Sequence, residues 1–321
     1  MSRPSNSIDT RLISKISSLY YHQEMNQQEI ADKLHLSRPK VSRLLKQAKE
    51  MGIVKITVTA PDHHVIETEN ALEIKFGLKE VLVVEIDSPD PSAADSIIKK
   101  QLGAAAASYL LRTVSDGDII GLTWGTTLQA MIDAVQPKPV KNVHVVQTLG
   151  GVGPPEAKTH AADISRRLSQ LLGGRLTLLS APGIVGNEEA KKVLLSDRHV
   201  KEALNLFSAI TIAYVGIGAL STNPVLQKES PEITHELREE LFQSEAVGDI
   251  GLNFFDIDGK EVNTRFKDLF IGMALNELKH VKTVVGIAGG KSKTKAITGA
   301  LRGGHIDVLI TDQFTAEDLA G

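Results

Sequence analysis

The sequence predicts an α/β protein with a small N-terminal helix-turn-helix domain of the winged type and a larger domain built on a Rossmann-like, doubly wound sheet. Three observations support this fold class. Short amphipathic segments with helix-capping residues fill residues 1–60, strand-like runs alternate with helical ones from residue 80 onward, and the two parts differ in the sign of their net charge. The expected domains are therefore residues 1–60 and 61–321.

The composition is that of a soluble globular protein. The chain of 321 residues is longer than one average domain, and its 42% hydrophobic and 23% charged residues suffice for a sizeable core. No apolar run is long enough to cross a membrane, and the N-terminal segment lacks the apolar region of a secretory signal. The absence of cysteine excludes disulfides, thiolate metal sites and a cysteine nucleophile. These features predict a cytoplasmic protein without a membrane partner.

The net charge of −3 conceals an asymmetry. Residues 1–60 hold ten Lys/Arg and five Asp/Glu, a net charge of +5, which leaves −8 on the remainder. A basic N-terminal part on an acidic body suggests that the N-terminal part meets a polyanion. A chance local imbalance is the alternative when charge is considered alone.

Three helices are predicted in the first sixty residues. Apolar residues recur at steps of three and four from Ile8 to Tyr20, which indicates an amphipathic helix. A second helix begins after Asn26, whose side chain can cap it, and Glu29 can bond back to Asn26 to complete a capping box. Ser37 can cap a third helix in the same way.

The second and third helices, joined by a tight turn, form a helix-turn-helix arrangement with basic residues along the third helix. The start of that helix enters the DNA major groove, and the start of the preceding helix reaches the phosphate backbone. The sequence therefore predicts DNA binding rather than a merely solvated basic face. The expected DNA-binding residues are Gln27, Gln28, Ser37, Arg38, Lys40, Ser42 and Arg43.

Two further elements connect this region to the larger domain. Residues 53–59 are β-branched and alternate in polarity, which predicts a strand that would form the wing and end at Pro61. Residues 65–76 predict a short helix closed by Gly77. Its apolar positions fit either pairing with a second copy of the chain or packing onto its own domain.

An alternation of strands and helices fills the larger domain. Strands are expected at 81–86, 119–123, 143–148, 210–215, 283–287 and 308–311. Helices are expected at 93–111, 127–135, 162–172, 269–278 and 293–301. This rhythm predicts a mostly parallel sheet covered on both faces, in which ligands gather at the carboxyl ends of the strands.

Four strand-end loops carry chemistry that suits a phosphorylated ligand. Residues 121–127 and 148–153 run from a strand through glycines, where backbone N–H groups can cradle a phosphate. Residues 248–250 offer a carboxylate to sugar hydroxyls, and residues 288–293 place lysine at a helix start. Each loop alone fits an ordinary turn equally well. The expected effector-binding residues are Gly125, Thr126, Thr127, Asp249 and Lys293.

Cofactor and metal sites have little support in the sequence. Residues 216–218 resemble a dinucleotide-binding motif but lack its third glycine, so no nucleotide cofactor is expected. The pair His63 and His64 has no partnering carboxylate pattern, so no metal site is expected. No catalytic residue is assigned.

Four segments, in the same order along almost the whole chain, resemble the SorC family of sugar-responsive regulators. They are MNQQEIADKLHLSRPKVSRLLKQAKEMGIVKITV, GLTWGTTL, EAVGDIGLNFFDIDGKEV and GIAGGKSKTKAITGALRGGHIDVLITDQFTA. The last segment is the most specific, because helix-turn-helix sequences are shared by many families.

The resemblance implies an effector domain related in fold to sugar-phosphate isomerases and CoA transferases, which binds its ligand without turnover. It also implies sugar-phosphate effectors and tetramers built as pairs of dimers on the operator. Residues 125–127 would hold the phosphate, Lys293 would neutralise it, and Asp249 would bond to sugar hydroxyls. Some relatives carry a basic residue where this chain has Leu149, which removes the basis for a covalent imine or an extra phosphate contact there.

The sequence thus predicts a DNA-binding transcriptional regulator of a carbohydrate-catabolic operon, controlled by a sugar or sugar phosphate bound to its larger domain. It is expected to act on operator DNA as a homo-oligomer, either a dimer or a tetramer. The alternative from another class is an isomerase-like enzyme acting on a sugar phosphate, with Asp249 as its only obvious base. A scaffold without a ligand conflicts with several phosphate-suited loops on one chain.

Overall fold

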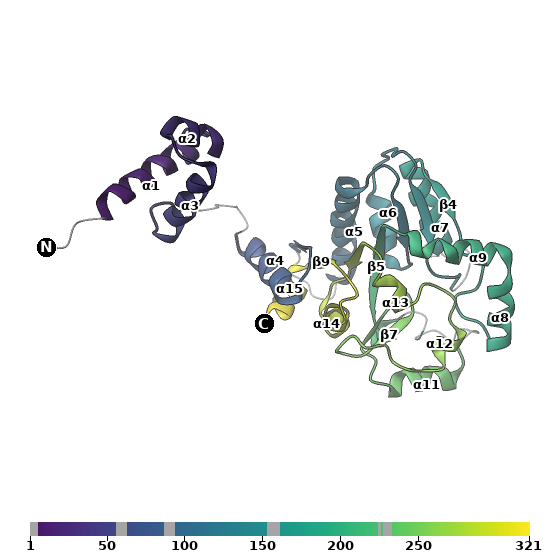
Figure 1. Ribbon diagram of the computed structural model, residues 1–321. Coiled ribbons are helices and arrows are strands. Elements are labelled where there is room, and N and C mark those ends of the chain that lie inside the picture. Colours follow the sequence, from purple (N-terminus) through teal and green to yellow (C-terminus); the bar gives the residue numbers. More distant parts are fainter. Residues whose placement is uncertain (1–5, 56–62, 87–93, 153–160, 224–225, 227–232) are drawn as a thin grey trace. The chain divides into compact units, whose positions relative to one another are not determined.

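The computed structural model describes residues 6–55, 63–86, 94–152, 161–223, 226 and 233–321 (Figure 1). The chain divides into two compact units, Met1–His63 and His64–Gly321, where the sequence predicts a boundary after residue 60. Each unit has its own hydrophobic core.

The N-terminal unit contains three helices, α1 (Asn6–Tyr21), α2 (Gln27–Leu34) and α3 (Arg38–Glu50). Apolar side chains from all three pack together and exclude water from the centre of the unit. These buried residues are Ile16, Leu19, Ile30, Ala31, Val41 and Leu45. The predicted helix-turn-helix is confirmed, with α2 and α3 joined by a short turn.

The caps of α2 form as predicted, and that of α3 does not. The Asn26 side chain accepts hydrogen bonds of 3.0 Å from the N–H groups of Gln28 and Glu29, and the Glu29 carboxylate accepts one of 2.8 Å from the N–H of Asn26. His35 ends α2 in the left-handed conformation with φ of 52°. Ser37 occupies the cap position of α3 in extended conformation, but its hydroxyl makes no capping bond. The expectation that Ser37 caps α3 was therefore wrong, and its hydroxyl stays available to another partner.

The predicted wing strand falls mostly outside the described residues. Of residues 53–59, only 53–55 are described, and they form a bend and an irregular segment rather than a strand. Residues 56–59 lie outside the described part of the chain.

Helix α4 (His63–Phe76) begins the C-terminal unit and packs onto its own sheet. Leu72 is fully buried in the core of the unit. The carboxylates of Glu69 and Glu73 accept hydrogen bonds of 2.8 and 2.9 Å from the N–H groups of Val83 and Val81 in the first strand. These two bonds satisfy N–H groups of an edge strand. Within one chain, α4 therefore packs onto its own domain, one of the two possibilities that the sequence left open.

Seven parallel strands form the main sheet among the described residues. Their spatial order is β1 (Glu80–Val84), β9 (Val308–Asp312), β8 (Thr283–Ile287), β5 (Ile212–Ala219), β2 (Ile119–Leu122), β3 (His144–Gln147) and β4 (Arg175–Thr177). Two short antiparallel strands, β6 (Gly248–Ile250) and β7 (Asn253–Phe255), extend from the carboxyl end of β5. The doubly wound sheet is confirmed, and its order reverses between β5 and β2.

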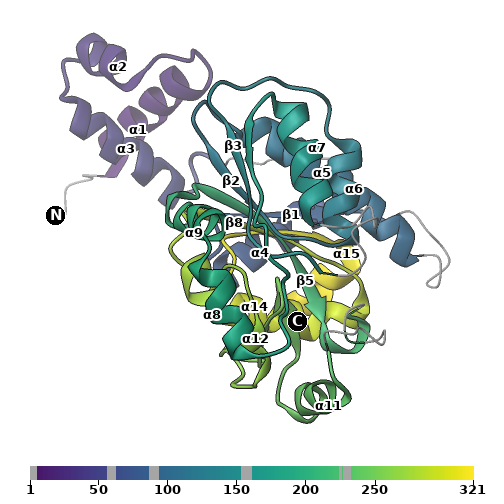
Figure 2. The ribbon, with the colours of Figure 1, turned by 90° about the vertical axis from the view of Figure 1, so that its right-hand side faces the viewer.

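Helices cover both faces of this sheet (Figure 2). Helices α5 (Ala94–Thr113), α6 (Thr126–Ala134) and α7 (Ala161–Leu172) bury their apolar sides against one face. Helices α4, α9 (Arg198–Asn205), α14 (Thr294–Arg302) and α15 (Gln313–Ala320) cover the other. A third cluster of apolar residues lies beside the sheet and includes α11 (His235–Gln243) and residues around β7.

The structure corrects the predicted helix at 269–278. This segment contains the end of α12 (Phe266–Leu269) and α13 (Leu275–Leu278), separated by extended backbone. Bridges from Phe270 to Ile184 and from Gly272 to Leu149 hold the extended part. Long-range pairing overrides the local helical pattern here. The sequence also missed β4, α9, α11, α15 and α8 (Glu188–Ser196).

Candidate functional site

The exposed face of α3 presents the predicted DNA-binding side chains. Val41, Leu45 and Ala48 face the core, so the opposite side of the helix carries the basic residues to solvent. Six of the seven predicted residues are exposed, and Gln27 is half-buried. The exposed ones are Gln28, Ser37, Arg38, Lys40, Ser42 and Arg43.

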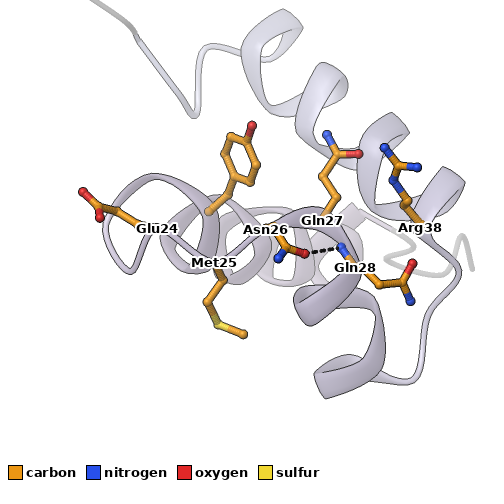
Figure 3. Close-up of a pocket in the computed structure, with 7 residues that line it drawn as sticks. Glu24, Met25, Asn26, Gln27, Gln28 and Arg38 are labelled. Carbon is orange, nitrogen blue, oxygen red and sulfur yellow. Dashed lines mark hydrogen bonds between the residues drawn. The ribbon is translucent and has the colours of Figure 1, made fainter.

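A hollow of about 830 Å³ lies where α1, α2 and α3 meet (Figure 3). Gln27 and Arg38 extend to the same side of it from the starts of α2 and α3. The N-terminal ends of both helices therefore open onto one surface that carries amide and guanidinium donors. Such a surface suits phosphate oxygens, which accept hydrogen bonds from these side chains.

In the C-terminal unit, a cavity of about 410 Å³ lies at the carboxyl ends of the central strands. Residues 124–128 line it from the start of α6, and residues 216–218 line it from β5. Asp249 enters from β6, and Lys293 enters from the loop after β8. The five predicted effector-binding residues thus surround one cavity, at the point where the strand order reverses.

The start of α6 provides backbone donors to this cavity. Gly125 has φ of 129°, a conformation that residues with a side chain rarely adopt, and no side chain caps the helix. The N–H groups of the first helical turn have no acceptor within the helix and carry its positive dipole end. Thr126 is exposed beside them, and Thr127 is buried. This arrangement is suited to an anion.

Asp249 lines the same cavity and is only 5% exposed. One carboxylate oxygen accepts a hydrogen bond of 2.9 Å from the Asn223 side chain, and the other accepts one of 3.0 Å from the N–H of Leu252. Burial raises the pKa of Asp249, although the Leu252 N–H, the Asn223 amide and the charge of Lys293 oppose the shift. Asp249 therefore both closes the turn after β6 and presents a carboxylate to the cavity.

Lys293 ends a short 3₁₀ turn (Lys291–Lys293) directly before α14. Burial lowers the pKa of Lys293, and the charge of Lys99 lowers it further, while the carboxylates of Asp95 and Asp249 oppose the shift. A partly buried ammonium in this position would gain from an anionic ligand, because desolvation disfavours its charge.

The second predicted phosphate loop does not line the cavity in its described part, residues 148–152. A Cβ on Gly150 would lie 2.6 Å from the carbonyl oxygen of Pro182, so glycine is required there for close backbone packing. Leu149 is buried in the third apolar cluster. Gly153 lies outside the described residues. Residues 148–152 therefore do not contribute to this cavity, and the anion-binding interpretation of the loop stays a prediction.

Sequence reasoning missed several residues of the cavity. Asp95 and Lys99 reach it from the first turns of α5, and Asn223 reaches it from beyond β5. In the sequence, residues 216–218 were interpreted only as an incomplete nucleotide motif. In the structure, Gly218 of β5 lies opposite Asp249 of β6. The two glycines at the end of a strand were the available signal for a ligand site.

No group of three or more His, Cys, Asp or Glu side chains in the described ranges is arranged to hold a metal ion. No helix among the described residues is long and apolar enough to span a membrane.

Comparison with known proteins identifies the family. Residues 61–320 match the family model described as "Putative sugar-binding domain", and residues 16–55 match a winged helix-turn-helix DNA-binding model. The deoxyribonucleoside regulator of Bacillus subtilis is 35% identical over 309 residues, which cover 96% of this chain and 97% of that protein. The sorbitol operon regulator of Klebsiella pneumoniae is 30% identical over 318 residues, 97% of this chain and 98% of that protein. The chain belongs to the SorC family of sugar-responsive transcriptional regulators.

Solved structures agree with this assignment. The full-length sorbitol operon regulator SorC from Klebsiella pneumoniae superposes with a TM-score of 0.75 at 30% identity, covering 98% of this chain and 100% of that chain. The SorC-family chain is a transcriptional regulator with a DNA-binding winged helix-turn-helix and a sugar-binding domain. The regulator interpretation is confirmed over the isomerase-like enzyme, since these relatives are regulators.

Proposed function

We propose that this SorC-family regulator controls a carbohydrate-catabolic operon and that a phosphorylated sugar, bound in the cavity of its C-terminal unit, is the effector. One observation carries the proposal. An uncapped helix start, a partly buried ammonium and a buried carboxylate meet around a cavity of about 410 Å³. A sugar phosphate matches this set of groups, since it joins an anion to several hydroxyl groups.

The phosphate is assigned to the α6 side of the cavity. Its oxygens would accept hydrogen bonds from the N–H groups and hydroxyls of residues 125–127, and Lys293 would neutralise its charge. The sugar hydroxyls are assigned to Asp249, whose oxygens each have capacity beyond the bonds from Asn223 and Leu252.

The operator is assigned to the N-terminal unit. Arg38, Lys40 and Arg43 on α3 would contact base edges and phosphates, together with Ser37 and Ser42. Gln27 and Gln28, at the start of α2, would hold the phosphate backbone. The assignment to a carbohydrate-catabolic operon is supported by the relatives, one a sorbitol operon regulator and another a deoxyribonucleoside regulator.

The regulator is further proposed to act in the cytoplasm as a homo-oligomer, a dimer or a tetramer. One helix-turn-helix covers too few base pairs for tight specific binding, so two copies would read two half-sites.

The experiment is an operator-binding titration of the full-length protein against matched pairs of sugar phosphates and free sugars. The operator is taken from the DNA beside the regulator's own gene. We expect one phosphorylated sugar to change operator affinity at a concentration where its unphosphorylated counterpart does nothing. A response to free sugars alone would refute the phosphorylated effector and leave the regulator assignment intact.

A further inference from the structure

An ion pair on α5 stands at the edge of the cavity and belongs to none of the motifs that predicted it. The Lys99 ammonium lies 2.6 Å from a carboxylate oxygen of Asp95, one helical turn away on the same helix. Both residues line the cavity; α5 packs against α6, and the charges of Lys99 and Asp95 act on Lys293. The Lys99 side chain is 31% exposed and that of Asp95 is 65% exposed.

This pair is well suited to exchange partners. Ion pairs between exposed side chains four residues apart on a helix stabilise it only slightly, because water screens them and both side chains lose rotamer freedom. Asp95 lies in the first turn of α5, where the helix dipole favours a carboxylate even without Lys99. Lys99 has a flexible four-carbon stem, so its ammonium can turn from Asp95 toward a stronger anion.

The charges around the cavity leave room for such an anion. Among the described lining residues, the positive charges of Lys99 and Lys293 balance the negative charges of Asp95 and Asp249. The formal net charge of the site is therefore zero when no ligand is bound. Lys99 is close enough to Lys293 to help lower the pKa of the latter. Two ammonium groups beside the start of α6 match the two charges of a phosphate dianion better than one.

We infer that Lys99 is a second phosphate-binding residue of the effector site, and that Asp95 is the counter-ion it leaves when the phosphate arrives. The inference rests on the proposed phosphorylated effector. It makes Asp95 a competitor of the ligand, so the pair tunes affinity for the phosphate group and not for the sugar. Ligands without a phosphate gain nothing from breaking the pair, and the site discriminates against them.

The test uses full-length protein and two probes, inorganic phosphate and the regulating sugar phosphate found by the operator titration. Affinities are measured by isothermal titration calorimetry at constant ionic strength. Lys99→Met should weaken both probes about tenfold, since a charge-assisted hydrogen bond is lost. Lys99→Arg, which keeps the charge, should retain most of the affinity. Lys100→Met, an exposed neighbour on α5 that does not line the cavity, is the matched control and should bind like wild type.

Asp95 supplies the sharper half of the test. Asp95→Asn should tighten phosphate binding severalfold, because Lys99 is then free of its competitor. In the Lys99→Met background the same substitution should lose most of this gain, since the gain depends on Lys99. Thermal melting of each variant verifies that it is folded.

Three results would overturn the inference, and they differ in whether the proposed phosphorylated effector is refuted as well. Unchanged phosphate affinity in Lys99→Met, with loss in Lys293→Met, refutes the role of Lys99 and leaves the proposed effector in place. Weakened binding in Asp95→Asn refutes the exchange, because Asp95 then positions Lys99 instead of competing for it. Absence of binding by wild type to every phosphorylated probe refutes both the proposed effector and this inference.

Discussion

The carboxylate of Asp312 accepts a hydrogen bond of 2.7 Å from the backbone N–H of Gly290, which ties the end of β9 to the loop that carries Lys293. Asp312 is fully buried, and it also accepts bonds from the N–H and hydroxyl of Thr315 at 3.0 and 2.7 Å. The position of Lys293 in the cavity therefore depends on a carboxylate that does not itself line it.

Asp312→Asn should lower the free energy of unfolding by about 1–3 kcal/mol, since an NH2 group replaces one of the two carboxylate oxygens that together accept three hydrogen bonds. Displacement of the loop that carries Lys293 should also lower the affinity for the effector. Thermal unfolding and effector titration of the full-length protein measure the two effects. Glu317→Gln, an exposed change on α15, the helix that Asp312 caps, should alter neither. Wild-type stability in Asp312→Asn would show that the loop is held by other contacts.

The ionisation of Asp249 should make the stability of the C-terminal unit depend on pH. Its pKa is raised by burial, so the folded protein keeps this proton to a higher pH than the unfolded chain does. The free energy of unfolding therefore loses a contribution as the pH rises past the ordinary aspartate value of about 3.9. Asp249→Asn lacks this loss, so its melting temperature relative to wild type should rise between about pH 4 and pH 7.

Melting curves over this pH range measure the difference between Asp249→Asn and wild type. Glu189→Gln, an exposed carboxylate change, should show no comparable trend. A relative melting temperature that falls with pH would mean that the bonds from Asn223 and Leu252 outweigh burial. Effector affinity should fall in Asp249→Asn at neutral pH, because a carboxylate acceptor for sugar hydroxyls is lost.

Much of the cavity was predictable because it follows from local sequence and parallel topology. Strand ends marked by residues 121–127 and 288–293 must lie at the same edge of a parallel sheet, so Gly125 and Lys293 were expected to approach each other. Asp249 does not follow from this reasoning, because it lies in an antiparallel strand that was not predicted from the sequence.

Other features depend on contacts that are distant in sequence. Gly150 resembles a phosphate-loop glycine, but the approach of Pro182 explains it. Residues 269–278 have a helical pattern, yet pairing of Phe270 with Ile184 keeps part of the segment extended. Lys99 reads as one half of an ordinary surface pair, and only the packing of α5 against α6 brings it to the cavity.

DNA binding should depend on salt through the basic residues of α3. Each phosphate neutralised adds about −0.9 to the slope of log affinity against log salt, so Arg43→Ala should reduce the slope by about that amount. Fluorescence anisotropy with an operator fragment at several salt concentrations measures it. Lys201→Ala, on α9 of the other unit, should leave the slope unchanged. Affinity of the wild type that does not respond to salt would contradict the assigned interface.

The C-terminal unit should supply most of the oligomer interface, since the N-terminal unit is small and committed to DNA. Both the full chain and residues 64–321 should therefore sediment as a dimer or tetramer at micromolar concentration. Residues 1–60 alone should sediment as a monomer. Analytical ultracentrifugation measures all three. If residues 64–321 are strictly monomeric while the full chain associates, the interface lies in the N-terminal unit or the segment that follows it.

The last prediction separates sensing from DNA binding. Lys293 and Thr126 line the cavity of the C-terminal unit, and neither belongs to the DNA-binding unit. Removing the ammonium in Lys293→Ala should cost about 1.5–3 kcal/mol of effector binding, or roughly ten- to a hundredfold in affinity. Thr126→Val removes a hydroxyl at the start of α6 and should lower the affinity for the effector less than Lys293→Ala does.

Both variants should fold and bind operator like wild type, yet respond to effector only at higher concentration. A ligand shifts a two-state switch only through its different affinities for the two states, so weaker binding must appear as weaker regulation. Operator-binding titrations of each variant against the effector measure this response. Lys291→Ala, exposed in the same 3₁₀ turn and absent from the cavity lining, should respond like wild type.

A wild-type response in both Lys293→Ala and Thr126→Val would place the effector elsewhere. Loss of operator binding without effector would instead show that these two side chains support the fold, because the DNA-binding surface lies in the other unit.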